Sequence, residues 1–195
     1  MSRPVGRRGG IRYTSIGTGK PVLVDQIHLA SLLLVTGLIL VALETTALSH
    51  IKIPLFGWQS AAPSLGLLFS MAVGFLHGER EGGVTGLLCG WLSDATTGEG
   101  VMLFPLLYFL CGYLSGTVGK RSLAHNLPSF GVFAAVGGGL KCLVALLTAS
   151  FDLGTLPPAV WVWKGLIPSW ILTILFSAVV YGIVKGEKWI LKPKA

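Results

Sequence analysis

The sequence predicts an all-α integral membrane protein, folded as one compact bundle of six short transmembrane helices with both termini in the cytoplasm. Of its 195 residues, 52% are hydrophobic and only 12% are charged, whereas a soluble domain has about 25% charged residues. The mean hydropathy of +0.74 points the same way. A soluble core could not bury this much apolar surface, so we expect lipid to be the solvent for most of the chain.

Six apolar segments are candidates for membrane spans, because a span needs roughly 17–25 predominantly apolar residues. The second and third are short, so we expect them to be buried among other helices or to lie where the bilayer is thin. Before the first span, residues 1–21 are polar and basic, which predicts a disordered cytoplasmic tail ahead of one polytopic domain at 22–190. The predicted spans are Ile27–Leu48, Ala61–His77, Gly82–Thr97, Val101–Val118, Pro128–Ser150 and Gly165–Lys185.

The distribution of positive charge predicts the topology. With the N-terminus inside, twelve of the fifteen Lys and Arg residues fall on cytoplasmic segments, and only Lys52 and Lys164 fall on external loops. Cytoplasmic loops of membrane proteins carry such an excess of basic residues. We therefore expect both termini inside, and the net charge of +7 does not indicate a nucleic-acid surface, because the basic residues lie in tails and loops.

Two consecutive spans form a glycine-rich hairpin, Gly82–Gly119, which we expect to be the centre of the domain. Gly82, Gly86 and Gly90 are four residues apart and therefore share one face of a helix. The return span carries Gly112 and Gly116 with the same spacing. Small residues at this spacing let transmembrane helices approach closely, so we predict a packing seam within the chain, with an interface to a partner protein as the less favoured alternative.

Four acidic or basic residues are singled out within or at the edge of the predicted spans, and Glu99, in the outer hinge, is expected to be solvated; the other three are Glu44, Asp94 and Lys141. A charge at the bilayer centre costs at least about 2.5–3.5 kcal/mol, so each residue needs a compensating partner or a function. One interpretation is a substrate or proton site. The favoured interpretation is a structural charge pair, in which Lys141 reaches Asp94 or Glu44, with Asp94 as the first candidate.

Signatures of catalysis are missing from the sequence. It has no HExxH, GxSxG or phosphate-binding glycine loop and no pair of histidines at i, i+4. No nucleophile and base can be paired from the pattern. We therefore expect a protein that is not an enzyme and binds no metal or cofactor.

A family resemblance rests on the second to fourth spans. A proline begins the second span, glycines lead to an aspartate in the third, and the fourth contains a Gly-Tyr-x-x-Gly run. These motif positions are Pro63, Gly86, Gly90, Asp94, Gly112, Tyr113 and Gly116. The pattern resembles the rod shape-determining protein MreD family and covers about half of the chain.

The resemblance implies a non-catalytic component of the bacterial inner membrane that serves cell elongation. Such a protein would bind the bitopic protein MreC. Together they would help connect cytoplasmic MreB filaments to the peptidoglycan synthases, a SEDS-family glycosyltransferase and a class B penicillin-binding protein. The resemblance assigns no role to the basic N-terminal tail or to Pro157-Pro158.

A second family with a similar outline remains open. The substrate-binding S-components of energy-coupling-factor vitamin transporters also have six short spans with both termini inside, and the predicted bundle resembles their fold. They usually carry two alanines four residues apart in the first span for docking. Ala30, Ala42 and Ala47 do not have this spacing, which makes this alternative less favoured.

Overall fold

The computed structural model describes residues 21–48, 62–97, 103–121, 126–153 and 162–190. Within these ranges the chain is helical apart from short connections, with six α-helices and no strand. The helices are α1 (Pro21–Leu43), α2 (Leu65–His77), α3 (Glu79–Thr97), α4 (Leu103–Arg121), α5 (Leu127–Leu153) and α7 (Ile167–Ile190). Two π-helical turns extend this set: η1 (Glu44–Leu48) continues α1, and η3 (Val162–Leu166) precedes α7.

The all-α class and the six predicted helical segments are confirmed, because each predicted span overlaps one of these helices. Two segments, 127–150 in α5 and 162–187 in η3 and α7, are long and apolar enough to cross a membrane. The apolar parts of α1, α2 and α4 are shorter. The predicted tail at 1–21 and the apolar segment around Pro157-Pro158 lie almost wholly outside the described residues.

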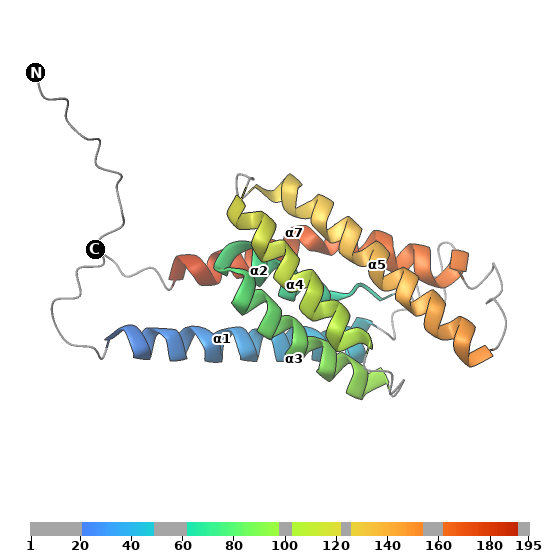
Figure 1. Cartoon of the computed structure of the whole chain (residues 1–195), viewed down its shortest axis with the longest axis horizontal. Coiled ribbons are helices and arrows are strands. Elements are labelled where there is room, and N and C mark those ends of the chain that lie inside the picture. The colour runs from blue at the N-terminus through green and yellow to red at the C-terminus, as the bar shows by residue number, and fades with distance from the viewer. Residues whose placement is uncertain (1–20, 49–61, 98–102, 122–125, 154–161, 191–195) are drawn as a thin grey trace, which may run out of the picture.

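Helix α2 is the centre of the bundle, which corrects the expectation that the hairpin of the third and fourth spans holds this place. Every residue from Leu65 to Leu76 is buried, and α2 contacts all five other α-helices. Figure 1 shows it in the middle, with α4 and α5 passing beside it. A helix that is apolar on all sides is expected to be enclosed in this way.

The connection between α2 and α3 is a single residue, Gly78. Its φ of 140° lies in a region that side chains rarely allow, which explains why glycine stands there. The Gly78 N–H donates to the carbonyl of Gly74 at 3.0 Å and so terminates α2. The turn places the beginning of α3 directly against the end of α2.

Aromatic rings fill the space between α2, α5 and α7. The ring centroid of Phe75 lies 6.0 Å from Phe130 and 6.4 Å from Tyr181, and those two rings are 5.3 Å apart. All three side chains are buried. This cluster fixes the two long apolar helices to the central helix.

Candidate functional site

The predicted glycine seam exists and joins α3 to α4. The facing pairs are Gly82 with Gly112, Gly86 with Tyr108, and Gly90 with Pro105. A Cβ atom on Gly90 would lie 2.6 Å from the Cα of Pro105, and one on Gly82 would lie 2.6 Å from the Gly112 carbonyl oxygen. The obstructing atoms belong to the backbone, which cannot move aside. These positions therefore require glycine for close helix packing.

The seam extends to α2 through Gly74, a residue that the sequence pattern did not single out. A Cβ on Gly74 would meet the Gly112 carbonyl and, at 2.5 Å, the hydroxyl oxygen of Ser115. That hydroxyl donates to the Met71 carbonyl at 2.9 Å. At the end of the seam, a Cβ on Gly116 would lie 2.8 Å from the Gly78 carbonyl carbon. The three helices meet backbone to backbone.

The remaining motif residues have different surroundings. Pro63 is buried in the segment that leads into α2, and Asp94 is 8% exposed on α3, one turn after Gly90. Tyr113 is 39% exposed, and its ring stacks on Phe109 with centroids 6.1 Å apart. Tyr113 therefore lies on the outside of the bundle and takes no part in the seam.

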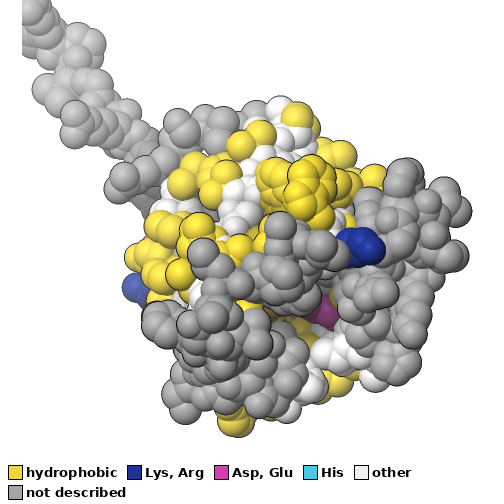
Figure 2. Space-filling view, turned by 90° about the vertical axis from the view of Figure 1, so that its right-hand side faces the viewer, with side chains coloured by type: hydrophobic (Ala, Val, Ile, Leu, Met, Phe, Trp, Pro, Cys, Tyr) yellow, Lys and Arg dark blue, Asp and Glu magenta, His cyan; other side chains and the backbone are white. Residues whose placement is uncertain are grey.

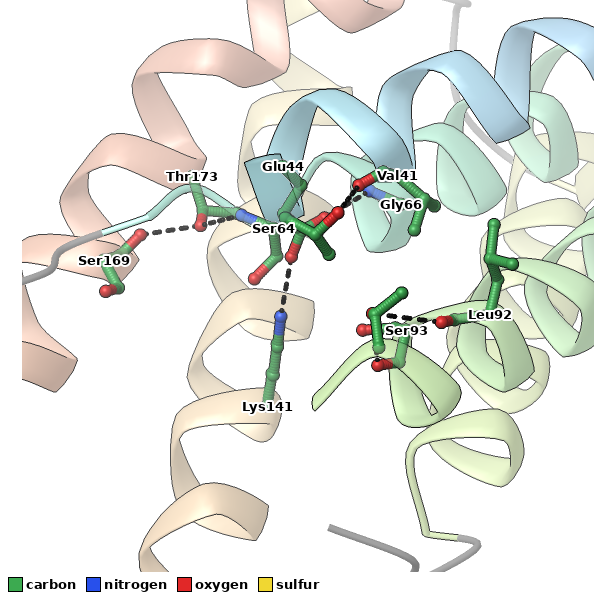
Figure 3. A network of polar contacts seen from close by, with 11 residues as sticks. Val41, Glu44, Ser64, Gly66, Leu92, Ser93, Lys141, Ser169 and Thr173 are labelled. Atoms are coloured by element: carbon green, nitrogen blue, oxygen red, sulfur yellow. Dashed lines mark hydrogen bonds and ion pairs between the residues drawn. The ribbon is translucent and has the colours of Figure 1, made fainter. Parts of the chain in front are cut away.

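A second arrangement, here called the polar junction, consists of Glu44, Lys141 and the Gly66 backbone N–H at the first turn of α2 (Figure 3). The ammonium of Lys141 lies 3.2 Å from Glu44 Oε1. The Gly66 N–H donates to Glu44 Oε2 at 3.0 Å. Helix N-termini carry unpaired N–H groups and partial positive charge, so a carboxylate is a favourable cap there.

The junction continues to α7 through hydroxyl groups. The Ser64 N–H donates to Thr173 Oγ1 at 3.1 Å, and the Thr173 hydroxyl donates to the Ser169 carbonyl at 2.7 Å. Thr173 is 2% exposed. Side chains from η1 and α7 thus accept hydrogen bonds from backbone N–H groups at the buried beginning of α2.

The carboxylate that pairs with Lys141 is not the one first expected from the sequence. Lys141 pairs with Glu44, so the first candidate, Asp94, was the wrong choice of partner. The ammonium also lies 5.6 Å from the centroid of the buried Tyr108 ring, at a distance typical of a cation–π contact. The Glu44 carboxylate contacts both the Lys141 ammonium and the N-terminus of α2, and both groups stabilise its negative charge.

Sequence reasoning also missed a carboxylate on α7. Glu187 is 9% exposed, and its Oε1 accepts a hydrogen bond from the Thr36 hydroxyl at 2.6 Å. This contact joins α1 to α7, whose residues are 151 positions apart. No sequence signal marked it, because Glu187 follows the predicted span and lies between Lys185 and Lys188 near the end of α7.

The glycine seam and the polar junction both hold helices together. Among the described residues, no group of three His, Cys, Asp or Glu side chains is placed to hold a metal ion. The seam lets the helix backbones pack closely together, and the polar junction links helices through an ion pair. Both are suited to keeping six helices, and surfaces built on them, in fixed positions.

No family model, curated protein or solved structure matches the chain. The resemblance to MreD therefore rests on the motif residues themselves.

Proposed function

We propose that the chain is a multi-pass protein of the bacterial inner membrane, with both termini in the cytoplasm. The exposed side chains support this proposal, because Val132, Val136 and Leu143 on α5 and Leu175 on α7 are each more than half exposed. Soluble monomers rarely expose such continuous apolar surface. Figure 2 shows hydrophobic side chains over much of the described surface around the end of the bundle that faces the viewer.

We propose further that it acts without catalysis in the cell-elongation machinery, binding MreC and helping couple MreB filaments to peptidoglycan synthesis. The observation that carries this proposal is the glycine seam. Gly86, Gly90, Gly112 and Gly116, on which the resemblance to MreD rests, all need close backbone approach. A rigid bundle of this kind is suited to presenting fixed surfaces to partner proteins, the synthases among them.

Co-purification is the direct test. We expect tagged full-length protein, extracted from membranes in mild detergent, to retain MreC from the same bacterium. Depletion should also turn rod-shaped cells round. A normal cell shape after depletion, together with no captured MreC, would rule the proposal out.

A substrate-binding S-component is the second candidate, and the polar junction is the observation that favours it. Charged and polar groups from several helices meet at the first turn of α2. In Figure 2, acidic side-chain atoms lie set back from the surface at one end of the bundle. Saturable binding of a vitamin by the purified protein would support this candidate over the first.

A further inference from the structure

An open apolar groove of about 180 Å³ lies between α1 and α3 and is here called the α1–α3 groove. Its floor contains two buried side chains, the Phe69 ring of α2 and Cys89 of α3. Exposed side chains such as Leu38 of α1 and Trp91 of α3 form its rims. The lining, which carries no charge within the described residues, is Leu33, Leu34, Gly37, Leu38, Phe69, Thr85, Leu88, Cys89, Trp91 and Leu92.

The size of the groove favours a slender occupant. A cavity of about 150 Å³ holds a molecule such as benzene, whereas a helix with its side chains is about 10–12 Å across. On α3 the lining extends from Thr85 to Leu92, which is about 10 Å along the helix axis. Leu34 and Leu38 on α1 are more than half exposed, so in the proposed membrane location the groove opens to lipid. The acyl chain of a membrane lipid has the shape and the polarity that this groove fits.

Two side chains of opposite charge lie beyond one end of the groove. Arg80 and Glu81 are both exposed in the first turn of α3. Glu81 is one helical turn before Thr85, which lines the groove, and the Thr85 hydroxyl donates to the Glu81 carbonyl oxygen at 2.7 Å. The charged pair is therefore about 5.4 Å from the apolar lining along α3. The proposed topology places this end at the cytoplasmic interface, where lipid headgroups lie.

These charges distinguish between lipid headgroups. A guanidinium such as that of Arg80 forms strong hydrogen bonds with phosphate. The carboxylates in the same turn, Glu79 and Glu81, repel an anionic lipid such as phosphatidylglycerol, which offers them no cation. Phosphatidylcholine has a cation, but its quaternary ammonium has no N–H group to donate. Phosphatidylethanolamine has both a phosphate and a primary ammonium, which donates hydrogen bonds as a lysine ammonium does.

We propose that the α1–α3 groove binds one acyl chain of phosphatidylethanolamine, whose phosphate pairs with Arg80 and whose ammonium pairs with Glu81. The inference rests on the membrane location in the proposed function and is independent of MreC. The acyl chain lies over the Phe69 ring and beside Leu88, and the exposed Trp91 ring packs against it. One ordered lipid thus fills the space that α1 and α3 leave between them.

Headgroup preference is the first test. The full-length protein in mild detergent is given equal amounts of phosphatidylethanolamine and phosphatidylglycerol with identical acyl chains, and native mass spectrometry counts the lipids that it retains. We expect the wild type to retain about fivefold more phosphatidylethanolamine, which corresponds to about 1 kcal/mol, the upper value for an exposed ion pair. Glu81→Lys, at an exposed position, should reverse the preference. Equal retention of both lipids by the wild type, or an unchanged preference in Glu81→Lys, would overturn the proposal.

Filling the groove is the second test. Leu88→Trp adds bulk at an exposed lining position, so folding should survive, and Val136→Trp on the exposed face of α5 is the matched control. We expect Leu88→Trp to retain at least about fivefold less phosphatidylethanolamine, because overpacking costs about 1–3 kcal/mol, and the control to match the wild type. Equal retention by Leu88→Trp and the control would overturn the groove assignment.

The two proposals fail in different ways. Recovery of the wild-type protein in the soluble fraction of cells would overturn both the proposed location and the lipid site. Recovery in membranes without a preference for phosphatidylethanolamine would overturn the lipid site alone.

Discussion

The glycine seam and the polar junction hold the same bundle together by opposite means. In the seam, α3 and α4 approach because side chains are missing, and the contacts are between backbones. In the junction, Glu44 and Lys141 reach across 97 positions of sequence to satisfy each other and the first turn of α2. One region depends on shape and the other on charge.

This difference explains which region can be recognised in a sequence. The seam joins consecutive helices, so its glycines, which are four residues apart, can be recognised within one short segment of the sequence. The junction joins η1, α2 and α5, and no local pattern indicates which carboxylate Lys141 meets. Close packing at glycines also tolerates less change than a polar contact, because backbone atoms cannot rearrange around an added side chain.

The largest effect is expected for Gly90→Leu in the seam. The added side chain would collide with the Pro105 backbone, and we expect a loss of about 3 kcal/mol or more in stability. Protein level in membranes and melting temperature in detergent would measure it. Gly182→Leu is the matched control, because nothing lies within 4 Å of a Cβ on Gly182. Similar losses for both variants would mean that the seam has no special role.

A smaller effect is expected for Lys141→Met in the polar junction. Removal of the ammonium leaves Glu44 buried with a single described hydrogen bond, which should cost about 2 kcal/mol, between the values for buried ion pairs and for polar contacts in membranes. Thermal unfolding in detergent is the measurement. Asp94→Asn should add to this loss independently, because Asp94 is not the ion-pair partner. Strong coupling between the two substitutions would restore Asp94 as the partner.

The smallest effect is expected at the contact between α1 and α7. Thr36→Val removes the hydroxyl that donates to Glu187 and should cost about 1 kcal/mol, whereas Thr36→Ser keeps the donor and should be near neutral. Melting temperatures of the three proteins would reveal the difference. If Thr36→Ser lost as much as Thr36→Val, packing of the threonine methyl group would matter more than the hydrogen bond.

The positions of the helices and the seam could be predicted, because both depend on residues close together in sequence. Hydropathy marks each segment, and Gly82, Gly86 and Gly90 mark one face of α3. Their shortness suggested burial of the second and third spans alike, but only α2 is enclosed, since Val84 and Trp91 on α3 are more than half exposed. Burial of Gly74 and pairing of Glu44 likewise depend on tertiary contacts.

The single-residue turn at Gly78 has a consequence for how such a chain is made. Helix α2 has 13 residues and is about 20 Å long, shorter than the hydrocarbon core of a typical bilayer. In the proposed location it would be poorly retained by lipid alone, and Gly78 allows no spacer before α3. At that location we expect the two helices to enter the membrane as one hairpin during synthesis, which would give Gly78 a role in biogenesis as well as in the finished fold.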